Sequence, residues 1–225
     1  MGGSSSATAD PHGPRARPRL RGVFHLYAFF VAIVIGGLLV AGAPHTKTRV
    51  AAAVFAAAVA LMFGASALHH RVTWRERGYR WSRRLDHAGV YLAIAGTYTP
   101  FGLLVLSGTW RIVVLAVVWG GALAASVLKF VWVDAPKWLA AAIAIALGWV
   151  AVIIFPQLID GVGWDGTALV LAGGLFYTLG GLVYALRRPD PLPAVFGYHE
   201  IFHLLVVAAV ALQYSVVAFW LVHPV

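Results

Sequence analysis

Residues 49–70 of the 225-residue chain read RVAAAVFAAAVALMFGASALHH, an apolar run of about 20 residues that ends in two histidines. At a rise of about 1.5 Å per residue, a helix of this length crosses the roughly 30 Å hydrocarbon core of a bilayer. Similar runs recur along the chain, which is 61% hydrophobic and 11% charged, with a mean hydropathy of +0.83. These features predict an all-α membrane protein and exclude a secreted globular enzyme or a nucleic-acid-binding domain.

Charged residues, glycine and proline bound the spans of a predicted seven-transmembrane helix bundle. The spans cover residues 22–42, 49–70, 86–106, 110–131, 137–156, 167–186 and 199–221. Residues 1–21 are rich in Gly, Ser, Pro and Arg, so we expect a disordered basic cytosolic tail, and we expect residues 222–225 to form an external tail. The first span exceeds the roughly 7–15 residues of a signal-peptide apolar region, which predicts a retained anchor.

The basic residues predict the orientation of this bundle. Fourteen of the 17 Lys and Arg residues fall on one side of the predicted membrane: Arg15, Arg17, Arg19, Arg21, Arg71, Arg75, Arg77, Arg80, Arg83, Arg84, Lys129, Lys137, Arg187 and Arg188. Only Lys47, Arg49 and Arg111 fall on the other side. Because basic loops stay in the cytosol, we expect a multipass protein of the plasma membrane with a cytosolic N-terminus and an external C-terminus.

Ionisable residues are costly inside a membrane, so those within the spans indicate function. Three groups lie at predicted cytosolic ends of spans: Ser66 with His70, Asp86 with His87, and His199-Glu200 with His203. Because His199 and His203 are four residues apart, they share one helix face and can bind one ion together with His70. The chain has no cysteine, so nitrogen and oxygen must be the ligands. Three protein ligands plus a water are typical of catalytic Zn²⁺.

Asp86 is a candidate to orient that water or accept its proton, with Ser66 beside it. Both residues also have structural interpretations, since Ser66 could ease helix packing and Asp86 could cap the third span. His69 and His87 point about 100° away from the proposed ligands on their helices. We expect these two histidines to support the site from outside or to lie at the membrane interface.

A competing motif is His199-Glu200-Ile201-Phe202-His203, which matches H-E-x-x-H, in which the glutamate is the general base of a metalloprotease. Glu200 could instead interact with the positive end of the seventh helix. The isolated histidines are predicted to be interfacial side chains: His12, His25, His45 and His223.

Three motifs resemble one family: Gly64-Ala65-Ser66-Ala67-Leu68-His69-His70, then Leu85-Asp86-His87 leading into Ile94-Ala95-Gly96-Thr97-Tyr98-Thr99-Pro100-Phe101, then Tyr198-His199-Glu200-Ile201-Phe202-His203. The chain resembles the hemolysin III branch of the progestin and adipoQ receptor (PAQR) family, which is related to adiponectin receptors and, more distantly, to alkaline ceramidases. The resemblance implies a zinc ion bound by His70, His199 and His203, with water between the metal and Asp86, and Ser66 beside them. It also implies hydrolysis of lipid amides such as ceramides, where an activity has been assigned.

The leading hypothesis is therefore a Zn²⁺-dependent hydrolase that acts on an amide or ester of a membrane lipid. One alternative is a non-enzymatic pore-forming, lysis-associated or receptor protein in which zinc only ties helices together. A second alternative is an intramembrane metalloprotease that uses His199, Glu200 and His203. We expect a lipid partner and no nucleic acid, and the sequence leaves the oligomeric state open.

Overall fold

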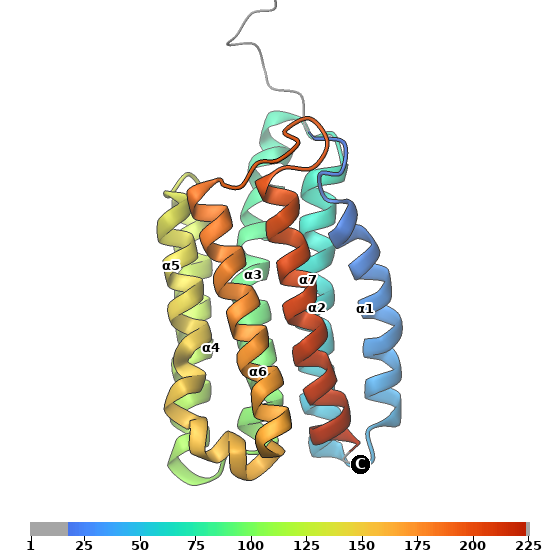
Figure 1. The fold of residues 1–225 in the computed structure, drawn as a ribbon, viewed down its shortest axis with the longest axis vertical. Helices are drawn as coiled ribbons and strands as arrows, with labels where there is room; N and C mark the ends of the chain where they lie inside the picture. Colours follow the sequence, from blue (N-terminus) through green and yellow to red (C-terminus); the bar gives the residue numbers. More distant parts are fainter. Residues whose placement is uncertain (1–17, 224–225) are drawn as a thin grey trace, which may run out of the picture.

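The computed structural model describes residues 18–223 as a bundle of helices (Figure 1). The α-helices lie side by side along the long axis: α1 (Val23–Gly42), α2 (Thr46–Arg71), α3 (Glu76–Leu104), α4 (Gly108–Val131), α5 (Lys137–Gly148), α6 (Phe155–Leu186) and α7 (Tyr198–Val216). A 3-10 helix, η1 (Trp149–Ile154), joins α5 to α6, and a π-helical segment, η2 (Val217–Val222), continues α7. The all-α fold predicted from the sequence is confirmed for the residues described.

Within residues 18–223, five helical stretches are long and apolar enough to cross a membrane: Val23–Gly42, Thr46–Arg71, Gly108–Val131, Lys137–Leu186 and Tyr198–Val222. The stretch from Lys137 contains 50 residues, and Figure 1 shows that it runs down the bundle as α5 and returns as α6. Helix α3 is not in this set because its first turns are charged and its later turns contain Thr, Tyr and Gly. These helices indicate a multipass membrane protein.

Two breaks in regular helix turn the stretch of α5, η1 and α6 into a hairpin. Tyr98 of α3 donates its hydroxyl to the Gly148 carbonyl (2.6 Å) and accepts the Ala151 N–H (2.7 Å), at the place where α5 gives way to η1. Gly163 has φ 67° and ψ 179°, a conformation that glycine adopts without the steric cost of a side chain. The chain therefore reverses direction between α5 and α6.

Close packing of α3 against α2 determines where Asp86 lies. A Cβ at Gly96 would collide with Ala58 of α2, and a Cβ at Gly89 would lie 3.1 Å from the Met62 Cα atom. Small residues of this kind let membrane helices approach closely. The last turns of α2 and the middle of α3 are thereby brought together.

Helix α3 begins at Glu76, ten residues before the predicted start of the third span. The prediction treated the arginine-rich segment as a loop, whereas arginine is a good helix former and the segment is helical. Within it, Arg83 forms an ion pair with Asp134 (2.5 Å). Asp86 consequently lies inside α3, so its interpretation as the N-cap of that helix is wrong.

The two terminal predictions fall partly outside the described residues, which exclude 1–17 and 224–225. For residues 18–21 the prediction of a disordered tail is wrong, because the Arg19 N–H donates to the Ala194 carbonyl (3.1 Å) and the Leu20 N–H donates to the Val195 carbonyl (3.2 Å). At the other end, η2 includes Val222, which had been assigned to the external tail.

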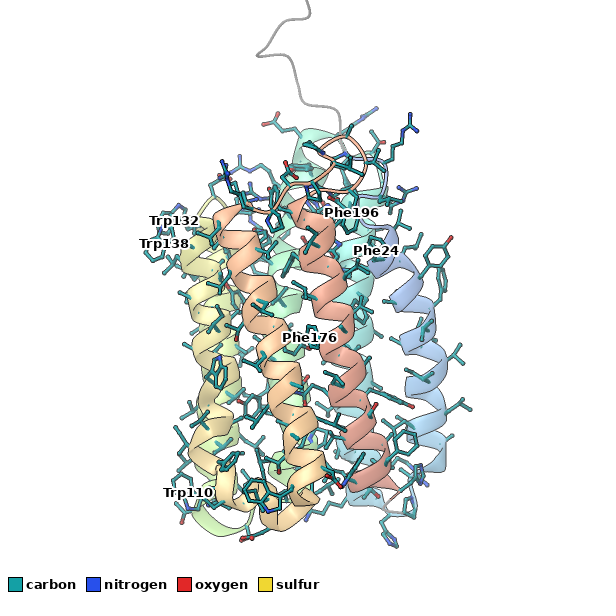
Figure 2. All side chains as sticks on the ribbon, in the orientation of Figure 1. Phe24, Trp110, Trp132, Trp138, Phe176 and Phe196 are labelled. Carbon is teal, nitrogen blue, oxygen red and sulfur yellow. The ribbon has the colours of Figure 1, made fainter. Side chains whose placement is uncertain are left out.

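Aromatic side chains mark the two ends of the bundle (Figure 2). Trp132 and Trp138 lie toward one end and Trp110 toward the other, and all three are exposed. Tryptophan is enriched at both membrane–water interfaces. At the end with Trp132, Phe24 of α1 makes an edge-on contact with Phe196, with ring centroids 6.1 Å apart. The start of α1 therefore packs on the connection between α6 and α7.

Candidate metal centre

Two helices bring three histidines to one place near an end of the bundle. His70 lies in the last turn of α2, and His199 and His203 lie in the first two turns of α7. Each offers a ring nitrogen, and these three atoms lie within 4.8 Å of one another. The sequence-predicted ligand set is thus brought together, and His199 and His203 share one face of α7 as their four-residue spacing requires.

The distances between these imidazoles fit a zinc ion. The Nε2 atoms of His70 and His199 are 3.0 Å apart. With Zn–N bonds of about 2.0–2.1 Å, ligand nitrogens of a tetrahedral site lie about 3.3 Å apart, so a shift of a few tenths of an ångström accommodates the ion. His203 is 1% exposed and its ring centroid lies 4.5 Å from that of His199. Three imidazoles, two of them buried and one partly buried, are a donor set suited to Zn²⁺, which the structure does not contain.

Asp86 lies beside this cluster. Its Oδ2 atom is 3.7 Å from the Nε2 atom of His70, and its carboxylate forms a side-chain hydrogen bond with Ser66. Ser66 precedes His70 by one turn of α2, so both reach the same carboxylate. The three residues form a continuous group of polar side chains next to the predicted ligands.

Glu200 has a different environment although it stands between two of the histidines in sequence. Its side chain is fully buried, its Oε1 atom forms an ion pair with the Arg21 Nε atom (2.5 Å), and its Oε2 atom accepts the Gly197 N–H (2.8 Å). Gly197 is the N-cap of α7, so this carboxylate satisfies a backbone donor at the start of the helix. Both oxygens are therefore engaged in holding the start of α7, which argues against Glu200 as the base of a metalloprotease.

The two neighbouring histidines, His69 and His87, lie beside the proposed ligands. The Nδ1 atom of His69 lies 2.8 Å from the Ser82 hydroxyl, which links α2 to α3. A second group that could hold a metal ion combines His69 with His70 and Asp86. His87 is partly buried and lines the cavity described below.

His25 lies beside His203 in the candidate metal centre, whereas the sequence had predicted an interfacial side chain. His25 is 2% exposed and stacks on His203 with ring centroids 3.7 Å apart and planes 7° from parallel. The position of His25 within the first span could have predicted this location. His25 lies three residues after the predicted start of that span, at the end of the bundle where the other polar groups gather. Of the other isolated histidines, His45 and His223 are exposed, and His12 lies outside the described residues.

An apolar cavity extends along the bundle from this cluster. The cavity has a volume of about 170 Å³, counted as the space that the centre of a water molecule can reach. One water needs about 10–15 Å³ by this measure, so the cavity is much larger than a single water site. Ser66, Asp86, His199 and His203 belong to its lining. On α3 the lining continues to Phe101, which is 15 residues or about 22 Å of helix beyond Asp86. The polar group therefore opens onto a long hydrophobic space between α3, α5, α6 and α7.

These features define a multipass helical membrane protein with a buried His/Asp group of the kind that binds a metal ion. The model of the family described as Haemolysin-III related matches residues 15–214. The chain belongs to this family, which confirms the resemblance based on the three sequence motifs.

Two relatives share this similarity over much of their length. Hemolysin-3 of Bacillus cereus is 32% identical over 136 residues, which is 60% of this chain and 59% of that protein. The Hemolysin-3 homolog of Bacillus subtilis (strain 168) is 30% identical over 169 residues, which is 75% of this chain and 76% of that protein. The match thus spans about three fifths of the Bacillus cereus protein and three quarters of the Bacillus subtilis protein.

Proposed function

We propose that this protein is a zinc-dependent hydrolase of a membrane lipid amide or ester. The observation that carries the proposal is the convergence of His70, His199 and His203 beside Asp86 at one end of a long apolar cavity. Three histidines that leave a ligand position open are typical of catalytic rather than structural zinc. The cavity supplies what a lipid chain needs, a hydrophobic space continuous with the polar group.

The residues around the ligands have complementary roles in this reaction. When bound, Zn²⁺ would supply a Lewis acid that polarises the substrate carbonyl and acidifies a water molecule. Asp86 accepts the proton of the attacking water at its carboxylate and returns it to the nitrogen or oxygen of the leaving amine or alcohol when the bond to the carbonyl carbon breaks. Ser66 holds that carboxylate through its hydrogen bond, so the oxygen that takes the proton stays beside the histidines.

The substrate class follows from the lining of the cavity. Most of its wall is aliphatic or aromatic, and the ionisable side chains Asp86, His199 and His203 lie at one end with Ser66, whereas Thr97, Thr178 and Gln213 are uncharged polar residues elsewhere in the lining. An alkyl chain is bound by the wall through the hydrophobic effect, which places the carbonyl at the polar end. The same arrangement serves an amide or an ester, so the test includes both.

The proposal includes a topology of seven spans in the plasma membrane. Helix α3 counts as a span because α2 and α4 pack on it as neighbours, and the stretch 137–186 counts as two because it folds into a hairpin. The excess of basic residues, fourteen against three, supports a cytosolic N-terminus and an external C-terminus. The metal centre then lies in the cytosolic leaflet.

Reporter fusions at the two termini test this topology. A reporter that is active only in the cytosol should give a signal at the N-terminus and none after Val225. A cytosolic C-terminus would contradict both the seven spans and the cytosolic placement of the metal centre.

The activity is tested with metal-replete protein in bilayers or mild detergent. A panel of ceramides, other lipid amides and lipid esters is incubated with the protein, and released fatty acid is measured by mass spectrometry. We expect turnover of at least one class, abolished in His203→Ala. If no class is turned over while chelation sharply lowers the melting temperature, zinc is a structural tie and the hydrolase proposal is wrong.

A further inference from the structure

His203 lacks the contact that usually orients a metal-binding histidine. Such a residue normally donates its second ring N–H to a carboxylate, a carbonyl or a water, which determines the orientation of the ring. The Nδ1 atom of His203 is buried and has no hydrogen-bond partner in the part of the chain that the structure describes. Among the described residues, ring contacts rather than a hydrogen bond at Nδ1 hold this side chain.

His25 of α1 makes that contact. Its ring lies flat against the ring of His203, with centroids 3.7 Å apart and planes 7° from parallel. Phe63 of α2 contacts His25 in an edge arrangement, with centroids 5.0 Å apart and planes at 61°. His25 is thereby enclosed between α2 and α7, and it restricts rotation of His203 about its side-chain bonds.

The same geometry shows that His25 does not share an ion with His203. A ring nitrogen binds a metal in the plane of its own ring, because its lone pair lies in that plane. The two rings are nearly parallel and their centroids are 3.7 Å apart, so an ion in the plane of His203 lies outside the plane of His25. The two nitrogens of His25 make no hydrogen bond of good geometry among residues 18–223, although a backbone group of His203 interacts with the His25 imidazole.

Gly22 lets α1 come close enough for this stack. It precedes the first residue of α1, has φ 77°, and a Cβ at this position would collide with the Cβ of His70. The start of α1 is therefore packed against the base of the side chain of a predicted ligand, and His25 follows three residues later. The stack is part of the way α1 packs on the metal centre.

We propose that His25 is a positioning residue whose ring face holds the plane of His203 for metal binding. The inference rests on the metal site under Proposed function, but not on hydrolysis. The face of the ring carries the role, and the nitrogens at its edge do not. This distinction separates the proposal from a role as a ligand or as a hydrogen-bonding group.

Cobalt binding tests the proposal, because the visible spectrum of Co²⁺ reports ligand number and geometry. Co²⁺ is added to metal-free protein, and its affinity and spectrum are compared among wild type, His25→Phe, His25→Leu and His25→Gln. Phenylalanine keeps a flat face without nitrogens, leucine has neither, and glutamine keeps polar atoms without the face. We expect His25→Phe to resemble wild type, and the other two to bind about tenfold more weakly or worse with an altered spectrum.

Each contrary result overturns the proposal in a distinguishable way. If His25→Phe binds Co²⁺ as weakly as His25→Leu, or if His25→Gln alone keeps wild-type binding, the ring nitrogens carry the role. If affinity and spectrum are unchanged in all three variants and only the melting temperature falls, His25 is a packing residue. If wild type binds neither Co²⁺ nor Zn²⁺, the proposed metal site is wrong, and His25 cannot have a role in metal binding.

Discussion

Asp86 and Glu200 are two carboxylates near the same histidines, but they have different surroundings. Glu200 is fully buried, and Arg21 and the Gly197 N–H engage its two oxygens. Asp86 lines the cavity and contacts His70 and Ser66. Although Glu200 is adjacent to His199 in sequence, its partners tie it to the start of α7. The comparison shows that the position of a carboxylate in a short motif does not determine its surroundings, because only Asp86 is left facing the cavity.

This difference also divides the polar end of the bundle into two regions. One region, formed by Arg21, Glu200 and the connection before α7, determines where the helix with two ligands begins. The other, formed by Ser66 and Asp86, faces the apolar cavity. Changes in the first region should alter stability, whereas changes in the second should alter turnover.

The largest expected effect is on turnover in Asp86→Asn. Asparagine has a similar shape and cannot accept the proton, so lipid hydrolysis should fall by about 10²- to 10⁴-fold, the usual contribution of general acid–base catalysis. Bound zinc and the melting temperature should stay close to wild type. Turnover is measured as product formed under saturating substrate, bound zinc by elemental analysis, and the melting temperature by thermal unfolding.

Glu200→Gln is the matched control for that experiment. It should change turnover little, because the Glu200 carboxylate is engaged by Arg21 and Gly197. If Glu200→Gln is inactive and Asp86→Asn is mild, the roles of the two carboxylates are exchanged and the metalloprotease hypothesis is revived.

A smaller effect, on stability, is expected for Arg21→Ala. Removal of Arg21 leaves the buried Glu200 carboxylate without its counter-ion, and breaking such a pair costs about 3 kcal/mol when one partner is partly exposed. Thermal unfolding of metal-free protein in detergent should show the loss. Adding Glu200→Gln to Arg21→Ala should recover part of it, since no unpaired charge then remains. Equal losses in the single and double variants would show that the ion pair does not hold this region.

The smallest effect is expected for Ser66→Ala. This change removes one hydrogen bond to the Asp86 carboxylate, and a bond to a charged group contributes about 1.5 kcal/mol, or roughly tenfold in rate. Turnover should fall by that factor while zinc content is unchanged. Loss of zinc in Ser66→Ala would instead indicate that Ser66 supports the ligands, and unchanged turnover would show that it only fills space between helices.

The sequence predicts most of this architecture because membrane helices have a simple sequence pattern. Apolar runs long enough to cross a bilayer locate the helices, and most observed bounds lie within three residues of the predicted spans. The depth of ionisable residues within those runs predicted that His70, Asp86, His199 and His203 would gather at one end. Both signals arise from the cost of polar groups in hydrocarbon.

Features that depend on lateral packing were missed. The rotation of α1 about its axis, which turns His25 toward His203, is determined by contacts with α2 and α7 that leave no periodic signal. The pairing of Arg21 with Glu200 joins residues 179 positions apart. The early start of α3 was missed because an arginine-rich segment has the same composition as a loop or as helical turns outside the apolar layer.

Zinc content is the measurement that tests the central claim most directly, namely that three histidines from two helices bind one ion. Freshly purified wild type should contain about one zinc per chain, and His70→Ala, His199→Ala and His203→Ala should each lose most of it. His69→Ala is the control from the adjacent position and should keep its zinc. Absence of zinc from wild type, or full retention in all three ligand variants, would contradict the account.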